Sequence, residues 1–358
     1  MAKLSLGTYQ HDMPLALNVS DWNVLNTSTT GQAFQPGRAG SPTPNFRTDR
    51  IDFTGTTLYY NVVDTAHGVI DTLSYKSYGA PGYVEQFKFS GLNVGYKDVV
   101  NNKADIMPLL LKGNDTITGN AFGNALHGFA GNDTVDGGAG NDQLFGDKGN
   151  DTLLGGEGDD QLVGGEGADR LDGGVGADTA SYATSSAAVS ASLLTGKGTF
   201  GDAKGDTFVA VENLTGSNFN DTLIGNGAAN TLAGQAGSDA LDGGKGNDLL
   251  DGGAGNDTII GGAGNDEIIA GSGKDQIWLG AGSDVLHFAP ADQITTVNDF
   301  DIKADHVDVS SFDAIDANNF QSFLHDTKTG CVLDLGHGDT LVFVGVHAAE
   351  LQATDFVF

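Results

Sequence analysis

Residues 128–181 read, in units of nine, GFAGNDTVD, GGAGNDQLF, GDKGNDTLL, GGEGDDQLV, GGEGADRLD and GGVGADTAS. A second array of the same period covers residues 234–287, with units such as GGKGNDLLD, GGAGNDTII and GGAGNDEII. Every one of these units has Asp at its sixth place. Two less regular units precede each array in the same register, which makes eight registers in each. Self-similarity at a fixed short period is typical of a solenoid in which successive units stack.

The nine-residue unit predicts a tight turn followed by a very short strand. Glycines at the first, second and fourth places permit positive φ and close backbone approach, so the first six residues are expected to turn. The eighth place is apolar and lies between two outward-facing neighbours, as strand alternation requires. The predicted inward-facing residues are Ile117, Leu126, Val135, Leu144, Leu153, Leu162, Leu171, Ala180, Leu223, Leu232, Leu241, Leu250, Ile259, Ile268, Ile277 and Leu286. Two units per coil would build two parallel sheets around a core one side chain deep.

Such a thin core does not offset the entropy of ordering so many glycines, so another interaction must hold the coils together. Stacking brings the sixth-place Asp of one unit beside that of the unit two further on, for example Asp133 beside Asp151. Facing carboxylates repel unless a hard cation lies between them, and a cage of carboxylate and carbonyl oxygens suits Ca²⁺. Counting these pairs predicts roughly nine bound ions or more. The predicted carboxylate ligands are Asp115, Asp133, Asp142, Asp151, Asp160, Asp169, Asp178, Asp221, Asp239, Asp248, Asp257, Asp266, Asp275 and Asp284.

GGAGND repeated in this way resembles the RTX (repeats-in-toxin) calcium-binding β-roll. The resemblance implies an all-β fold with two right-handed parallel β-rolls between β-rich N-terminal and C-terminal capping domains. In that family turn carbonyls join the Asp side chains in binding calcium between coils. The carbonyl ligands implied here belong to Gly131, Gly137, Gly140, Gly149, Gly155, Gly158, Gly164, Gly167, Gly246, Gly252, Gly255, Gly261, Gly264 and Gly273. The pattern is broken where Asn124 and Asn230 replace Asp, and where Phe219 replaces the turn glycine before Asp221.

The edges of the arrays divide the chain into five predicted segments. Stretches such as TLYYNVV and VEQFKFSGL predict strands before the first array, and residues 106–119 are expected to cover the end of the first roll. The insert between the arrays fits either wider coils without calcium or a hairpin excursion. The segments are a β-rich N-terminal domain (1–109), the first roll (110–181), an insert without calcium (182–215), the second roll (216–287) and a C-terminal β cap (288–358).

The 358-residue chain is strongly acidic, with 47 acidic and 17 basic side chains and a net charge of −30. Residues 110–181 hold 13 acidic and 3 basic side chains, and residues 216–287 hold 10 and 2. Because no basic stripe is present to neutralise phosphates, nucleic acid is not an expected partner. The single cysteine, Cys331, excludes an intrachain disulfide and is expected to be buried. No apolar run is long enough for a transmembrane helix.

Calcium sites of this kind need extracellular calcium, since extracellular modules bind it at about 10⁻⁴ to 10⁻³ M. The N-terminal sequence lacks the apolar region of a secretory signal. Residues 288–358, with DFDIKADHVDVSSF and GDTLVFVGV, are similar to the C-terminal part of RTX proteins, including the module of serralysin-type proteases. That resemblance implies type I secretion from a Gram-negative bacterium, directed by an uncleaved C-terminal signal that Asp355-Phe356-Val357-Phe358 matches. The same residues also fit the last strand of a cap.

Motifs for known RTX enzyme activities are absent from the sequence: there is no HExxH, no GxSxG and no P-loop. We therefore expect a non-enzymatic protein with structural histidines. The leading hypothesis is a secreted structural protein that self-assembles in a surface layer, biofilm matrix or adhesive coat. The alternative is a glycan-binding adhesin in which residues 1–109 recognise cell-surface polysaccharide. A polysaccharide-active enzyme stays a third alternative, since a pair of catalytic carboxylates can come from any two strands.

Overall fold

A computed structural model describes the backbone of residues 3–6, 47–53, 56–64, 69–77, 84–95 and 112–358, and the side chains from residue 112 onward except Asn120. The chain divides into two compact units, residues 1–176 and residues 177–358. Strands dominate both units, and the three helices of the described part are single turns of 3-10 helix. None of the described helices is long and apolar enough to cross a membrane. Residues 106–111, predicted to cover the first roll, lie outside the described residues.

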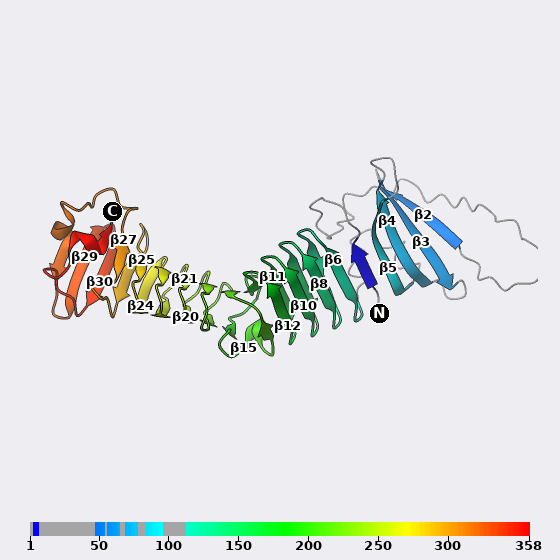
Figure 1. Ribbon diagram of the computed structural model, residues 1–358, viewed down its shortest axis with the longest axis horizontal. Helices are drawn as coiled ribbons and strands as arrows, with labels where there is room; N and C mark the ends of the chain where they lie inside the picture. The colour runs from blue at the N-terminus through cyan, green and yellow to red at the C-terminus, as the bar shows by residue number, and fades with distance from the viewer. Residues whose placement is uncertain (1–2, 7–46, 54–55, 65–68, 78–83, 96–111) are drawn as a thin grey trace, which may run out of the picture. The chain divides into compact units, whose positions relative to one another are not determined.

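The first unit opens with an antiparallel sheet, drawn in blue in Figure 1. It contains β2 (Arg47–Phe53), β3 (Thr56–Asp64), β4 (Val69–Ser77) and β5 (Val84–Gly95), each paired with the next. The strand β1 (Lys3–Leu6) is antiparallel to β5 and parallel to the first strand of the repeats. The N-terminal sheet is thus joined to the repeats by backbone hydrogen bonding through β1, a pairing that the sequence did not predict.

The repeats of the first unit form two parallel sheets with strands alternating between them. One sheet contains β6 (Thr116–Asn120), β8 (Thr134–Ala139), β10 (Thr152–Glu157) and β12 (Arg170–Val175). The other contains β7 (Ala125–His127), β9 (Gln143–Lys148) and β11 (Gln161–Glu166). Paired residues lie 18 positions apart, as Leu153 and Leu171 do, so one coil consists of two nine-residue units.

The second unit repeats this arrangement with more strands. One sheet runs through β13 (Thr179–Ser181), β17 (Asn213–Thr215), β19 (Thr231–Ala233), β21 (Leu249–Asp251), β23 (Glu267–Ile269), β25 (Val285–His287), β27 (His306–Asp308) and β31 (Phe356–Val357). The other runs through β14 (Ser190–Ser192), β18 (Thr222–Ile224), β20 (Ala240–Lys245), β22 (Thr258–Ala263), β24 (Gly273–Ala281), β26 (Gln293–Val297) and β30 (Asp339–Val344).

The insert combines the two conformations that its sequence left open. Strand β14 lies in the parallel sheet and pairs with β18, as a coil strand does. It is followed by an excursion of β15 (Lys197–Phe200), η2 (Gly201–Ala203) and β16 (Thr207–Val209), in which β15 is antiparallel to both β14 and β16. The insert is therefore one enlarged coil that carries a hairpin.

The C-terminal residues finish both sheets of the second unit. Strand β30 is followed outward by antiparallel β29 (Gly330–Gly336) and β28 (Leu324–Asp326), preceded in sequence by η3 (Phe320–Phe323). After η4 (Ala353–Asp355), β31 pairs with β27 and buries Phe356, which is 5% exposed. The last residues of the chain thus form the final strand of a cap, as one of the two interpretations of their sequence predicted, and their role as an export signal stays a prediction.

The core is the predicted single file of apolar side chains. All sixteen eighth-place residues are at most 2% exposed, from Ile117 to Leu286. Cys331 is buried as expected, and burial raises the pKa of its thiol to about 11. The predicted all-β fold of parallel β-roll coils is confirmed.

Candidate metal centre

The turn of most nine-residue units has glycine at its fourth place, where the backbone takes a positive φ. Gly149, for example, has φ of +139°, and a Cβ there would collide with the carbonyl oxygen of Gly131 in the preceding coil. Any other residue would therefore be strained by its backbone and by its neighbour. The same conformation, with φ between +99° and +158°, is found at Gly131, Gly140, Gly149, Gly158, Gly167, Gly246, Gly255, Gly264 and Gly273.

These turns stack the sixth-place carboxylates into ladders. In each step the backbone N–H of one Asp donates to Oδ1 of the Asp 18 residues later, at 2.7 Å from Asp133 to Asp151 and 2.9 Å from Asp248 to Asp266. The first unit has the ladders Asp115, Asp133, Asp151, Asp169 and Asn124, Asp142, Asp160. The second has Asp221, Asp239, Asp257, Asp275 and Asn230, Asp248, Asp266, Asp284. The predicted Asp pairs that lie within one compact unit, 1–176 or 177–358, are thus brought together. The pair Asp160 with Asp178, whose members belong to different compact units, stays a prediction.

In many of these carboxylates the second oxygen is buried without a protein donor. At Asp257, for example, Oδ1 accepts the backbone N–H of Asp239 in the preceding coil, while Oδ2 has no hydrogen-bond partner. A buried carboxylate oxygen left in this state is costly, so it calls for a ligand. This orphaned Oδ2 is found at Asp133, Asp142, Asp151, Asp239, Asp248, Asp257, Asp266, Asp275 and Asp284, all at most 2% exposed.

The first-place glycine keeps open a cradle beside the orphaned oxygen. A methyl group on Gly243 would lie 2.6 Å from Oδ2 of Asp248 and 2.6 Å from the carbonyl oxygen of Gly261 in the next coil. Two oxygens from different coils therefore face the same side of Gly243, where any side chain would exclude them. The predicted ligands Gly137, Gly155, Gly164, Gly252 and Gly261 occupy this first place in their own units.

The electrostatics of the ladders show carboxylates in need of positive charge. Burial raises the pKa of Asp142 to about 7, although the Asn124 amide opposes the shift, and Asp160 adds like-charge repulsion. Burial likewise raises the pKa of Asp257 to about 6 against the Asp239 amide, and Asp275 and Asp251 add to the rise. Such shifts mean that the ionised form is poorly compensated by the protein alone.

This donor set fits Ca²⁺ better than a transition metal. Among the described residues, no group of three or more His, Cys, Asp and Glu side chains is placed to hold a metal ion. The groups that the ladders bring together are carboxylate oxygens and backbone carbonyl oxygens, as Asp248 Oδ2 and the Gly261 carbonyl are, and this is the hard all-oxygen environment that Ca²⁺ prefers. When bound, the cation would neutralise the buried charge and link consecutive coils.

The registers that break the sequence pattern also differ in structure. Both carboxylate oxygens of Asp221 accept hydrogen bonds from Ser217. The side-chain Nδ2 of Asn230 donates a hydrogen bond to the backbone carbonyl oxygen of Glu212. Sequence reasoning missed Asp305, whose Oδ1 lies 3.2 Å from the backbone N of Asp284 and continues that ladder. The signal was present, because buried Val307 follows Asp305 by two places, as the eighth place follows the sixth.

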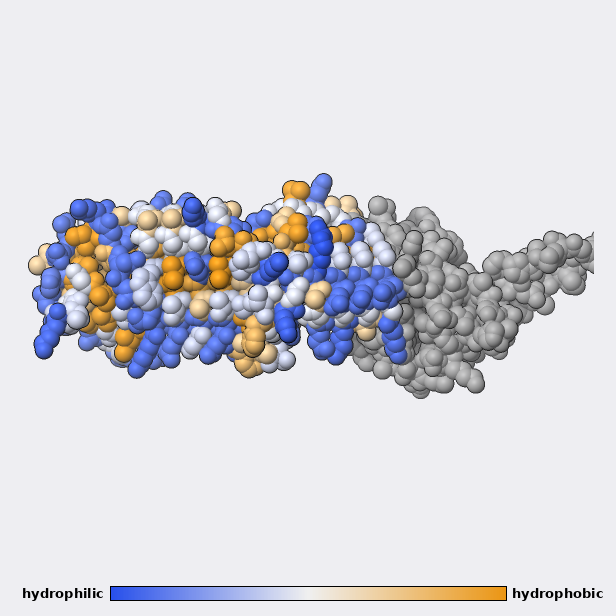
Figure 2. Space-filling model, turned by 90° about the horizontal axis from the view of Figure 1, so that it is seen from below, coloured by the Kyte–Doolittle hydropathy of each residue, from blue (hydrophilic) through white to orange (hydrophobic). Residues whose placement is uncertain are grey.

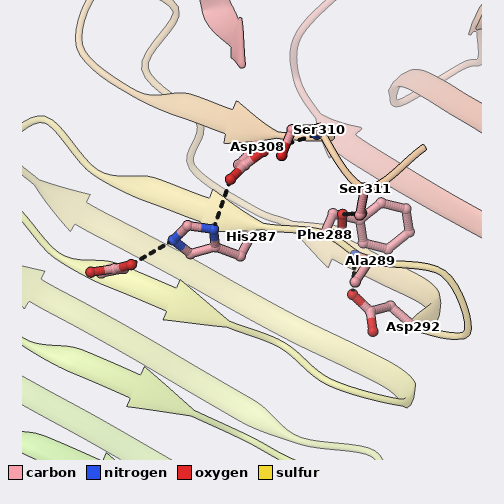
Figure 3. Close-up of polar contacts among 8 residues, drawn as sticks. His287, Phe288, Ala289, Asp292, Asp308, Ser310 and Ser311 are labelled. Atoms are coloured by element: carbon pink, nitrogen blue, oxygen red, sulfur yellow. Dashed lines mark hydrogen bonds and ion pairs between the residues drawn. The ribbon is translucent and has the colours of Figure 1, made fainter. Parts of the chain in front are cut away.

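One histidine ties neighbouring coils together on the sheet surface. His287 of β25 lies between two carboxylates, with Nε2 2.7 Å from Glu267 Oε1 of β23 and Nδ1 3.1 Å from Asp308 Oδ2 of β27 (Figure 3). His127 contacts Asp147 in the same manner at 3.0 Å and stacks on Phe145. The contacts of both residues agree with the structural role expected for them.

Three comparisons relate this sequence and structure to known proteins. The family model of the RTX calcium-binding nonapeptide repeat matches residues 112–144, 145–180, 215–250 and 251–286. A solution structure of the AlgE6R3 subunit of the Azotobacter vinelandii mannuronan C5-epimerase is 28% identical, with a TM-score of 0.26, over 39% of this chain and 79% of that one. The crystal structure of the extracellular lipase LipA from Serratia marcescens is 15% identical, with a TM-score of 0.28, over 72% of this chain and 41% of the lipase. A search of curated proteins finds no match.

Proposed function

Starting from a chain that carries RTX calcium-binding nonapeptide repeats, we propose a secreted structural protein whose two arrays become rigid when calcium binds between their coils. The observation that carries this proposal is the file of buried Asp Oδ2 atoms without protein donors. Without a cation, the arrays must bury repeated like charges around a core one side chain deep. Calcium binding is then coupled to folding, because the complete site exists only when coils are stacked.

Calcium-dependent folding can be tested on the full chain by circular dichroism. We expect strand signal from the arrays to be lost in EDTA and regained when calcium is added in excess. Calcium counted by native mass spectrometry should reach roughly nine ions or more, in line with the paired carboxylates. Retained array structure in EDTA would mean that the apolar core suffices alone.

We further propose export through a type I route, with the address in residues 288–358. A chain that folds only on meeting external calcium suits passage through a narrow channel, since folding outside opposes return. Because Phe356 is buried in the fold, a C-terminal deletion would confuse lost addressing with lost folding. Fusing residues 288–358 to an unrelated passenger separates the two effects, and residues 216–287 fused in the same way serve as the control. Retention of the first fusion inside cells that express the transporter would contradict the proposal.

Self-assembly into a surface layer, matrix or coat is the finer part of the proposal. Support comes from apolar side chains on the outer face of the second unit, where Ile260 of β22 and Trp278 of β24 are paired neighbours with 39% and 37% exposure. Apolar residues lie among polar ones in the left half of the molecule in Figure 2. Clustered exposed apolar residues favour association. Electron microscopy with calcium and with EDTA tests this: ordered arrays only with calcium support assembly, and monomers in both conditions contradict it.

A further inference from the structure

Asp221 occupies a ligand position, yet its carboxylate is already satisfied by the protein. The Ser217 N–H lies 2.5 Å from its Oδ2, and the Ser217 hydroxyl lies 2.8 and 3.0 Å from its two oxygens. Oδ1 also accepts the backbone N–H of Val189 at 2.7 Å. Both side chains are buried, with Asp221 2% and Ser217 0% exposed. In the same ladder, Oδ2 of Asp239 and of Asp257 has no such donor.

Ser217 is the feature that sets this register apart. It stands at the second place of the unit GSNFNDTLI, and no other unit of either array has a hydroxyl residue at that place. Its hydroxyl and its amide both point at the carboxylate, so the negative charge is stabilised by charge-assisted hydrogen bonds in place of a cation. A donor group directed at Oδ2 also excludes a cation from that side.

In the next register, that of Asn230, a different set of contacts takes the place of a cation. Asn230 carries no charge, and its Oδ1 accepts the Asn226 N–H at 2.7 Å. Its Nδ2 donates to the carbonyl oxygen of Glu212 at 2.7 Å. Because the Glu212 carbonyl oxygen already accepts this hydrogen bond, it is not available as a calcium ligand, and the NH₂ group directs a donor toward it. The sixth-place side chains of the first two registers of the second array, Asp221 and Asn230, therefore have hydrogen-bond partners without a metal ion.

The enlarged coil before these two registers also needs no cation. The Tyr182 hydroxyl donates to Asp206 Oδ2 at 2.8 Å, and both residues are at most 3% exposed. Its apolar core is wider than that of a nonapeptide coil, with several buried residues in place of one per unit. They are Val189, Ala191, Leu193, Ala203, Phe208, Val211 and Leu214.

From these contacts we propose that residues 182–233 fold without calcium, that Asp221 and Asn230 hold no ion, and that this segment is the template on which the second array is built. Its last two strands, β18 and β19, pair with β20 and β21 of the first calcium-dependent coil. Leu223 lies opposite Leu241, and Leu232 lies opposite Leu250. In a stacked solenoid each coil contacts only its neighbours, so a preformed coil spares the array its costly nucleation. This inference rests on the proposed calcium-coupled folding of the arrays.

Hydrogen–deuterium exchange of the full chain, in EDTA and in millimolar calcium, tests the template directly. Peptides from residues 182–233 should be protected in both conditions, whereas peptides from residues 239–284 should be protected only with calcium. Exchange of residues 182–233 in EDTA as fast as the arrays would overturn the inference. Protection of residues 239–284 in EDTA would instead contradict the calcium-coupled folding, so the two failures are distinguishable.

Calcium stoichiometry by native mass spectrometry gives a second, independent test. Asp221→Asn should leave the number of bound ions unchanged, while the matched change Asp257→Asn in the same ladder should lower it. Ser217→Gly, which restores the common residue of the second place and removes the hydroxyl, should raise it, and Ser217→Thr should keep it at the wild-type value. An equal loss of calcium in Asp221→Asn and Asp257→Asn would show that the Asp221 register does bind an ion.

Discussion

Acidification should fold the calcium-free arrays, in contrast to the usual effect of acid on a protein. Several ladder carboxylates have folded-state pKa values above the ordinary 3.8, about 7 for Asp142 and about 6 for Asp257. The folded state therefore binds protons more tightly than the unfolded state, and stability falls as pH rises. The loss begins above the unfolded pKa, near pH 4, and is complete once the pH passes the folded pKa, near pH 7.

The size of the effect follows from the two pKa values. A rise from 3.8 to about 7 corresponds to a cost of about 4 kcal/mol for keeping Asp142 ionised in the fold. The same reasoning gives about 3 kcal/mol for Asp257. Both side chains are only 1% exposed, so solvent screening does little to reduce these values. Each of these costs is a sizeable fraction of the total stability of a typical domain, about 5–15 kcal/mol.

The assay is far-ultraviolet circular dichroism between pH 8 and pH 5, in calcium-depleted buffer and in millimolar calcium. Without calcium, strand signal and thermal midpoint should rise as pH falls. With calcium they should fall, because protons then compete with the cation for the carboxylates. Light scattering distinguishes folding from aggregation. Slopes of the same sign in both buffers, or no gain of structure without calcium, would refute the assignment of the ladders as uncompensated carboxylates.

Three further predictions concern single residues. Asp248→Asn should lose bound calcium and lower the thermal midpoint in calcium, while Asp313→Asn, at an exposed position outside the ladders, should change neither; isothermal titration calorimetry measures the binding and thermal unfolding the midpoint. Gly149→Ala should destabilise the calcium-loaded protein by about 1–3 kcal/mol, because its φ of +139° and the Gly131 carbonyl leave no room for a methyl group. Leu250→Ala should cost about 2–5 kcal/mol in calcium, since this fully buried side chain is the core of its half-coil. Denaturation in calcium by guanidinium measures both, and a cost below 1 kcal/mol would contradict either prediction.

Local sequence periodicity was sufficient to predict most of the fold and the ladders. An aliphatic every nine residues places one side chain inside each half-coil, and two half-coils set the spacing of 18 that brings Asp133 beside Asp151. The glycines constrain the turn because positive φ and coil-to-coil contact leave little alternative. These features recur at every nine or eighteen residues, so they can be read from the repeated sequence.

What only the tertiary structure decided lies where the repetition stops. A sequence cannot say which oxygen of Asp248 meets an amide and which is left for a cation, because that depends on how the next coil stacks. Nor does the sequence reveal that the Ser217 hydroxyl donates a hydrogen bond to Asp221, or that β1 pairs with β6 and β31 with β27. The contacts of β1 and β31 follow no fixed spacing along the chain, and the spacing of 18 does not reveal which oxygen of Asp248 is left without a donor. Their partners are chosen by the packing of whole coils and not by local propensity.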